Sequence, residues 1–130
     1  MKSINPESLG RPRGYSNGLL TEPGARLLFV AGQIGWDENQ RLVGDDFVEQ
    51  FERALRNLLA VVLEAGGEPC GVARLVVYVT DKREYAARTR EIGERWRALM
   101  GRHFPAMTLV EVSALLEDGA KVEIEGIAVL

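Results

Sequence analysis

The sequence predicts an α+β domain in which two helices cover one face of a mixed β-sheet. Two segments, residues 46–65 and 81–101, carry apolar residues at spacings of three and four, as amphipathic helices do. Short apolar runs rich in β-branched residues precede, separate and follow these segments, and they predict strands. The resulting order is β(β)αβαββ. A chain of 130 residues with this pattern is expected to form one domain over residues 1–130.

The N-terminal part of the chain predicts irregular structure followed by a first strand. Residues 1–25 are rich in Gly, Pro, Ser and Asn, which favour turns and loops. The apolar run 27–33 predicts a strand, and residues 36–40 predict a polar turn. Residues 41–43 are expected to form a brief returning strand.

The first helix has recognisable ends in the sequence. Asp46, followed three residues later by Glu49, resembles a capping box, and Gly66-Gly67 ends the helix. Two pairs four residues apart, Glu49–Arg53 and Glu52–Arg56, are expected on the face toward water. The apolar stripe consists of Phe47, Phe51, Leu55, Leu58 and Val62.

A strand over residues 72–80 leads into the second helix. Asp81 and Glu84 begin this helix in the same capping pattern, and Gly101 ends it. We interpret its stripe as core rather than as a cofactor site, with Trp96 the member best suited to touch a ligand as well. The stripe consists of Tyr85, Thr89, Ile92, Trp96 and Leu99 with Met100.

The last part of the chain predicts a hairpin that carries unusual carboxylates. Strands 107–114 and 121–129 flank Asp118-Gly119, a strong turn signal. Glu111, Glu123 and Glu125 lie within these otherwise apolar strands, and Glu123 and Glu125 point to one face. Three interpretations remain open: a solvated edge, ion pairs between subunits with arginines such as Arg74, and a pocket carboxylate that handles a proton or a water.

The second face of the sheet predicts self-association. The runs LLFVAG at 27–32 and LVVYV at 75–79 are apolar on both sides, whereas a sheet with one buried face alternates more cleanly. No third helix is predicted, so another copy of the chain is the economical cover. Sites in such assemblies often lie between subunits.

Composition and motifs exclude several function classes. The net charge is −3, from 16 Lys and Arg against 19 Asp and Glu, and the charges are interleaved, which argues against nucleic-acid binding. His103 and Cys70 are single residues of their kinds, and no metal motif or phosphate loop occurs, so we expect no metal and no cofactor. His103 is expected to cap a helix end. No secretory signal and no apolar run of about 18 residues is present, so we expect a cytoplasmic protein without a membrane span.

Several short motifs, taken in order, resemble one known family. They are Gly14-Tyr15-Ser16, Val30 to Ile34, Glu64-Ala65-Gly66, Val77 to Asp81, Phe104-Pro105-Ala106, Val110-Glu111-Val112 and Val122 to Ala128. On these motifs the chain is identified as a member of the RidA/YjgF family of reactive-intermediate deaminases, formerly called endoribonuclease L-PSP.

This resemblance implies both an architecture and an activity. It implies a chorismate-mutase-like α+β fold and a homotrimer, in which three sheets surround a central barrel and small-molecule clefts lie at the subunit interfaces. Active members hydrolyse enamines and imines derived from amino acids, such as 2-aminoacrylate, to a 2-keto acid and ammonia. They need no metal and no organic cofactor.

The resemblance also assigns site residues, with departures at the most important one. The family's carboxylate-binding arginine corresponds to Met107, a thioether that cannot form the bidentate pair. A common cysteine corresponds to Leu109 and a common serine to Ala31, so the site is less polar than in relatives. A replacement by Arg13, Arg74 or Arg88 is an open alternative without support in the sequence. The matching positions are Tyr15, Gly32, Thr89 and the catalytic candidate Glu123.

Two functions of different classes follow. In the first, the chain hydrolyses a neutral or otherwise anchored imine, with Glu123 orienting water and moving a proton while Tyr15 closes the pocket. In the second, a non-catalytic trimer holds a small apolar ligand, which Ala31, Met107 and Leu109 favour. An endoribonuclease or translation inhibitor, and a purely structural trimer, are less favoured.

Overall fold

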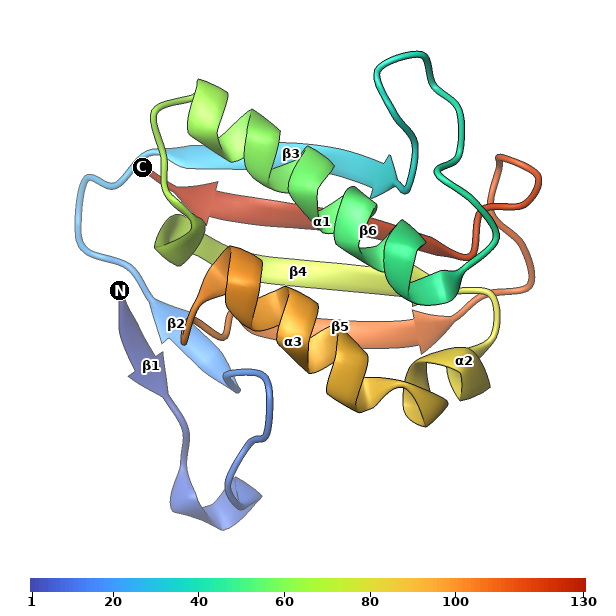
Figure 1. The fold of residues 1–130 in the computed structure, drawn as a ribbon. Coiled ribbons are helices and arrows are strands. Elements are labelled where there is room, and N and C mark those ends of the chain that lie inside the picture. Colours follow the sequence, from blue (N-terminus) through green and yellow to red (C-terminus); the bar gives the residue numbers. More distant parts are fainter.

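The structure is a computed structural model that describes residues 1–130. A four-stranded mixed sheet forms one layer of the molecule. Its strands are β3 (Leu27–Ile34), β4 (Val72–Val79), β5 (Ala106–Glu111) and β6 (Val122–Val129). They lie in the order β3-β6-β4-β5 (Figure 1). β6 is antiparallel to both of its neighbours, and β4 and β5 are parallel.

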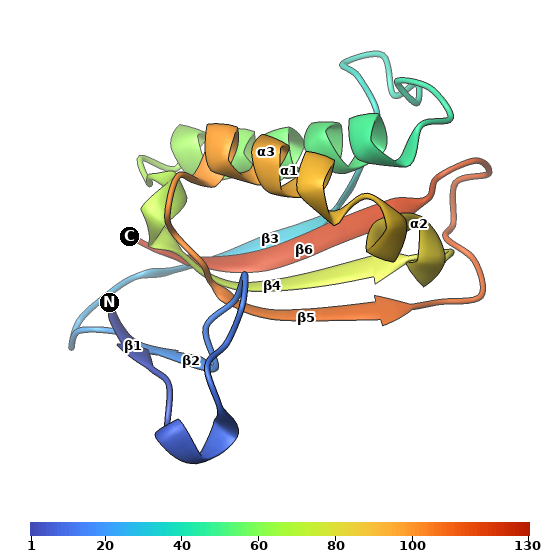
Figure 2. The ribbon, with the colours of Figure 1, turned by 60° about the horizontal axis from the view of Figure 1, so that its bottom comes forward.

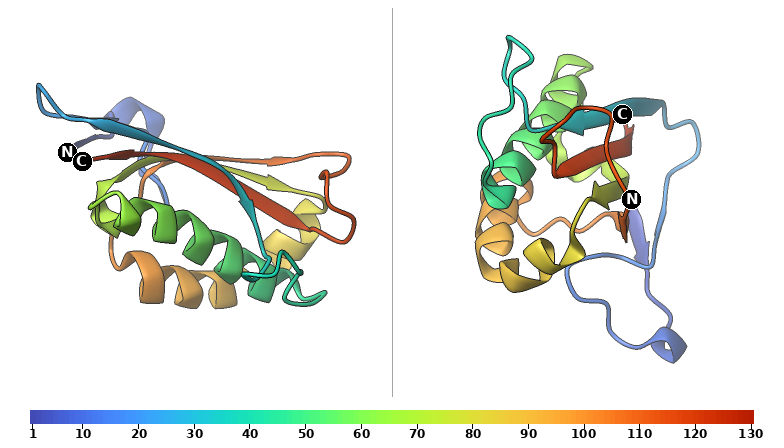
Figure 3. Two further views of the ribbon diagram at one scale, coloured as in Figure 1. Left: turned by 90° about the horizontal axis from the view of Figure 1, so that it is seen from above. Right: turned by 90° about the vertical axis from the view of Figure 1, so that its right-hand side faces the viewer.

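The second layer consists of helices on one side of this sheet (Figure 2). α1 (Phe47–Glu64) and α3 (Thr89–Met100) run side by side across it, and the short α2 (Lys82–Ala87) precedes α3 (Figure 3). A core of 19 buried residues fills the space between the layers. Each large apolar side chain buried there contributes about 1.5–3 kcal/mol. The largest core side chains with almost no exposure are Phe47, Leu55, Leu58, Leu75 and Ile124.

The predicted ends of α1 are confirmed. The Asp46 carboxylate accepts a hydrogen bond from the Glu49 N–H at 3.0 Å. At the other end Gly66 has φ +83°, a conformation that favours glycine. The expected Glu52–Arg56 pair forms at 2.8 Å. The expected Glu49–Arg53 pair is wrong, because Arg53 instead donates to the Trp36 carbonyl and lies 3.6 Å from Glu38.

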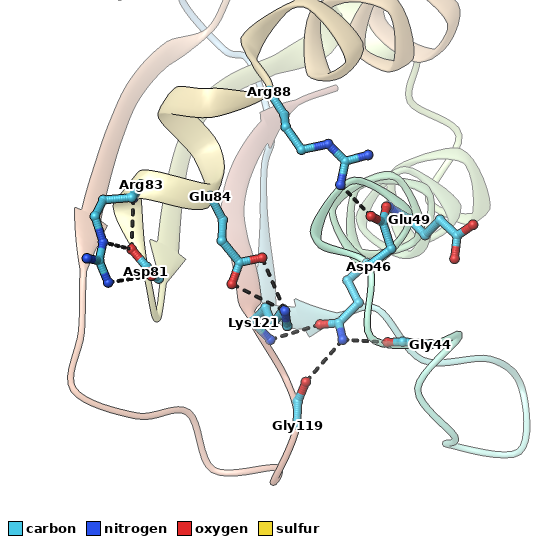
Figure 4. A network of polar contacts seen from close by, with 10 residues as sticks. Gly44, Asp46, Glu49, Asp81, Arg83, Glu84, Arg88, Gly119 and Lys121 are labelled. Atoms are coloured by element: carbon cyan, nitrogen blue, oxygen red, sulfur yellow. Dashed lines mark hydrogen bonds and ion pairs between the residues drawn. The ribbon is translucent and has the colours of Figure 1, made fainter.

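The second predicted helix is two helices, broken at Arg88. Arg88 has φ −129°, outside the helical range. Its guanidinium donates to Asp46 at the start of α1 (Figure 4), and also to Glu91 in α3. The break therefore accompanies a tertiary contact that joins the α2–α3 junction to α1. The predicted cap also differs, since the Asp81 carboxylate accepts from the N–H of Arg83 and not from that of Glu84.

The predicted C-terminal hairpin is wrong, because β4 lies between β5 and β6. The turn itself forms: Gly119 has φ +85° and the Ala120 N–H donates to the Glu117 carbonyl. Its position is set by Gln50, a buried side chain of α1, which donates to the Gly119 carbonyl and accepts from the Lys121 N–H. Gly119 and Lys121 are labelled in Figure 4. The connection 112–121 thus docks on α1 and carries the chain past the end of β4.

The N-terminal region contains more order than predicted in one place and less in another. β1 (Lys2–Ile4) pairs with β2 (Gly18–Leu20) in a separate two-stranded sheet. A 3-10 turn lies at Glu7–Leu9 in this region, and another lies at Pro69–Gly71, between α1 and β4. The brief strand expected at 41–43 is wrong, since only one isolated bridge joins Trp36 and Leu42 there. None of the helices is long and apolar enough to cross a membrane.

The face of the sheet opposite the helices, which we call the open face, is exposed in the single chain. It carries Phe29, which is 71% exposed, and Leu27, which is 54% exposed. In β6 the residues Glu123, Glu125 and Ile127 point to this face, because the alternating residues of the strand are buried in the core. The open face is therefore apolar with embedded carboxylates, as the sequence predicts.

Candidate functional site

A cavity of about 570 Å³ lies between α3 and the β5 edge of the sheet, and we call it the α3 cavity. This volume is in the range of small-molecule sites. Met107 and Leu109 line it because they are in register with the buried Leu75 and Val77 of β4 and so face the helices. Thr89, the first residue of α3, also lines it. Three of the predicted ligand-binding residues therefore meet here.

Aromatic side chains form one wall of the α3 cavity. The rings of Trp96 and Phe104 are stacked, with centroids 6.4 Å apart and planes tilted by 1°. The Trp96 indole N–H donates to the His103 carbonyl at 3.1 Å, which fixes the ring. Burial raises the pKa of Tyr85 above its ordinary value of 10.0, so its hydroxyl remains a hydrogen-bond donor at neutral pH. The expectation that Trp96 belongs to the core is confirmed, and it also lines this cavity.

The rim of the α3 cavity is cationic, and of its arginines only Arg13 was considered from the sequence. Arg90 and Arg97 of α3 line the cavity together with Arg13 of the N-terminal segment. No carboxylate, histidine or cysteine is among its lining residues. The spacing of Arg90 and Arg97 by seven residues was a usable signal for one shared helix face, but their position above β5 depends on tertiary packing.

A second group of predicted site residues lies on the open face. Glu123 faces away from the core, between the buried Val122 and Ile124. A Cβ built on Gly32 would overlap the Glu123 carboxylate, so the glycine leaves room for this side chain to lie against β3. Ala31 lines a separate hollow of about 390 Å³ on the same face. The sheet separates this group from the α3 cavity.

The other carboxylates of β5 and β6 have structural partners. The Tyr78 hydroxyl donates to Glu125 at 3.1 Å. This hydrogen bond is the main reason that the pKa of Tyr78 is raised above 10.0, with burial and the charge of Glu125 adding to it. Glu111 accepts a hydrogen bond from the Lys82 N–H at 3.1 Å and so caps the start of α2. Neither Glu125 nor Glu111 is free in the way that the Glu123 carboxylate is.

Tyr15 lies in the N-terminal segment, beside the start of β5. The neighbouring Ser16 is buried, and it donates from its N–H to the Pro105 carbonyl (2.9 Å) and from its Oγ to the Phe104 carbonyl (2.7 Å). These bonds fix the segment. Tyr15, 40% exposed, lines a shallow hollow that shares Gly14 and Phe104 with the α3 cavity. It is next to that cavity but does not line it.

The single histidine and the single cysteine belong to neither group. The His103 ring nitrogen Nε2 lies 2.6 Å from the Val72 carbonyl, and the His103 N–H donates to the Met100 carbonyl at the end of α3. Cys70 is exposed in the turn Pro69–Gly71. No three His, Cys, Asp or Glu side chains are grouped as a metal site requires.

Comparison with known proteins identifies the family. The family model described as endoribonuclease L-PSP matches residues 8–130. The chain is a member of that family. The Myxococcus xanthus protein DfrA is a relative of this chain, 36% identical over 98% of the chain and 95% of its own length. The 2-iminobutanoate/2-iminopropanoate deaminase of Rattus norvegicus is 30% identical over 95% of the chain and 83% of its own length.

A solved structure agrees with the fold of this chain. The crystal structure of YyfB from Yersinia pestis, described as a Rid-family protein of unknown function, has a TM-score of 0.84 and 34% identity. It covers 99% of the chain, which covers 98% of YyfB. The RidA/YjgF resemblance and the α+β, chorismate-mutase-like fold class expected from it are thereby confirmed.

Proposed function

We propose that the chain is an imine or enamine deaminase that works as a homotrimer, with each site shared between two subunits. The observation that carries the proposal is the division of the site: no carboxylate, histidine or cysteine lines the α3 cavity, and Glu123 lies on the other face of the sheet. A neighbouring subunit whose open face also reaches the β5 edge would bring its Glu123 beside this cavity. The relatedness to an iminobutanoate deaminase at 30% identity supports the activity, and the exposed Phe29 supports the assembly.

The reaction requires one water and releases one ammonia. An enamine first tautomerises to the imine. Water adds to the carbon of the C=N bond while one of its protons passes to the nitrogen. The carbinolamine then collapses to a carbonyl group as its hydroxyl proton passes to the nitrogen and ammonia leaves. Glu123 accepts a proton from the water and returns it to the leaving nitrogen, a general acid–base role worth about 10²–10⁴ in rate. Tyr15 closes the site and hydrogen-bonds the ligand, and Gly32 and Ala31 keep the backbone close to it.

Substrate choice would differ from that of relatives at one position. Met107 offers no charge to a carboxylate at the strand position where the family resemblance implies an arginine. Losing one charge-assisted hydrogen bond costs about 1.5–3 kcal/mol, roughly ten- to a hundred-fold in affinity. Together Met107 and Leu109 favour a substrate with a larger apolar body, neutral or anchored elsewhere.

The second candidate is a binding protein without catalysis. Apolar and aromatic side chains make up most of the α3 cavity, and no carboxylate, histidine or cysteine lines it. Such a lining is sufficient for holding a ligand. We do not propose RNA cleavage, because the net charge is −3 and the only histidine is bonded to Val72. We propose a cytoplasmic location, without a membrane or nucleic-acid partner.

The deciding experiment is ammonia release from freshly generated imines and enamines, neutral and carboxylate-bearing, with the wild type and Met107→Arg. Turnover by the wild type supports the deaminase. Met107→Arg is expected to raise kcat/KM about ten-fold or more for small 2-imino acids, since it adds a charge-assisted contact. A wild type silent on every substrate, with activity appearing only in Met107→Arg, would favour the binding protein instead.

A further inference from the structure

Gly93 occupies an unusual place in the middle of α3. It is the one glycine of the chain that has no positive φ and whose added Cβ would meet no atom within 4 Å. A glycine inside a helix destabilises it by about 1 kcal/mol relative to alanine. Neither backbone conformation nor packing within the chain requires glycine here. What lies over Gly93 is the α3 cavity, which it lines.

Two arginines flank Gly93 on the same helix face. Arg90, Gly93 and Arg97 are spaced by three and four residues, so they form one stripe about 10 Å long that lines the cavity. These are also the arginines of α2 and α3 without a close ionic partner. Arg90 lies 3.7 Å from Glu94, with 93% of its side chain exposed, and Arg97 forms no ion pair. In contrast, Arg83, Arg88 and Arg95 pair with carboxylates at 3.3 Å or less.

We propose that the Arg90–Gly93–Arg97 stripe binds the anionic head group of an amphipathic ligand. The ligand class is a 2-imino acid or 2-keto acid with an aromatic or large apolar side chain. Its carboxylate lies over Gly93 between the two guanidinium groups, with Arg13 on the facing wall. Its apolar part lies against Trp96 and Met107. The absent side chain of Gly93 provides the room for the head group, which explains a glycine that the helix itself disfavours.

This inference rests on the proposed function, in that the same cavity holds the substrate. It deepens that function, because it moves charge recognition from the strand position of Met107 to a helix on the opposite wall. A head group held at α3 leaves more room between itself and β5 than a head group held at the strand position of Met107 would. The distance favours side chains larger than those of alanine-derived or serine-derived imines.

Equilibrium binding of a stable ligand pair tests the stripe without turnover. The probes are phenylpyruvate and phenylacetone, which share the aromatic ring and the ketone and differ by the carboxylate. Calorimetry on the full chain is expected to give about ten-fold or tighter binding of phenylpyruvate. Arg90→Gln and Arg97→Gln should each remove most of this preference while leaving phenylacetone binding unchanged. Arg102→Gln is the matched control, since Arg102 is exposed and lines no part of the cavity.

Gly93→Ala separates this role from a structural one. Because a Cβ there meets nothing, the variant is expected to melt at a higher temperature than the wild type and yet bind phenylpyruvate several-fold more weakly. The proposal would be overturned if Gly93→Ala, Arg90→Gln and Arg97→Gln all bound phenylpyruvate as tightly as the wild type does. So would an equal loss in Arg102→Gln, which would mean general electrostatic attraction.

The two proposals can fail separately. Charge-dependent binding that follows the stripe, without ammonia release from any imine, would leave the inference standing and remove the deaminase. Suppose instead that the rate of ammonia release depends neither on a carboxylate in the substrate nor on Arg90 and Arg97. The deaminase would then stand, and the binding role of the stripe would be removed.

Discussion

Glu123 lies where a substitution tests chemistry rather than folding. Its side chain is on the open face, against Gly32, while Val122 and Ile124 on either side hold β6 in the core. Glutamine has the same shape and cannot take a proton from water. Glu123→Gln is therefore expected to lower kcat for imine hydrolysis at least about 100-fold, with an unchanged circular dichroism spectrum and melting temperature.

Glu125→Gln is the control for this variant. Glu125 is two residues away on the same face and binds the Tyr78 hydroxyl. Its replacement should leave turnover within a few-fold of the wild type. Full activity in Glu123→Gln, or equal losses in both variants, would remove Glu123 from its proposed role.

At the scale of elements, α1 and α3 are joined through the start of α1. Asp46 caps α1 through the Glu49 N–H and also receives the Arg88 guanidinium. The hydrogen bond with Arg88, followed by the one from Glu49, holds the pKa of Asp46 below its ordinary value of 3.8. Since the folded-state pKa is the lower one, the unfolded chain takes up this proton first as the pH falls. The stabilisation is thus complete at neutral pH and is lost as the pH falls below about 4.

Asp46→Asn isolates the ion pair from the cap, because an asparagine oxygen still accepts from Glu49. The free energy of unfolding is measured in urea at pH 7 and at pH 3. Its decrease from pH 7 to pH 3 is expected to be smaller for Asp46→Asn than for the wild type. Asp46→Ala removes the cap too and should cost about 0.5–2 kcal/mol at pH 7. Asp45→Asn, at the exposed neighbouring carboxylate, is the control and should keep the wild-type pH dependence. Parallel pH curves for Asp46→Asn and the wild type would contradict this account.

The elements also separate what local sequence predicts from what it does not. The start and end of α1 were predictable because Asp46 and Gly66 act on groups within one helical turn. The break before α3 was not, since Arg88 contacts a residue 42 positions away. Nor was the central place of β6, where Gln50 of α1 fixes a turn 69 positions later. Strand order depends on such long-range contacts, which a periodic pattern does not contain.

The candidate site divides in the same manner. The residues that meet in the α3 cavity, such as Met107 and Leu109, follow from family resemblance combined with the two-residue period of a strand. Their separation from Glu123 by the sheet is a property of the folded chain. Arg90 and Arg97 share a helix face in the sequence, but nothing local to that helix relates them to β5.

At the scale of the whole molecule, the open face is the surface on which the proposed trimer depends. Phe29→Asp places a charge at a position 71% exposed in the single chain and outside the core. The variant is expected to stay folded, to sediment as a monomer and to lose turnover, because the two halves of each site no longer meet. Sedimentation velocity and ammonia release on the same samples measure both effects.

Leu116→Asp is the matched control, an equal change at a residue that is 100% exposed in the connection 112–121. It should remain trimeric and active. A monomeric Phe29→Asp with full turnover would mean that one chain carries a complete site, and a wild type that sediments as a monomer would remove the trimer.

The N-terminal segment has a consequence for how a ligand exchanges with the α3 cavity. No residue before Ser16 is buried, and the segment is attached to β5 mainly through the Ser16 hydrogen bonds. Segments with few buried contacts open locally at a much smaller free energy than the core. Arg13 and Gly14, which line the cavity, belong to this segment. One wall of the cavity can therefore move on a faster timescale than the wall formed by β5 and α3.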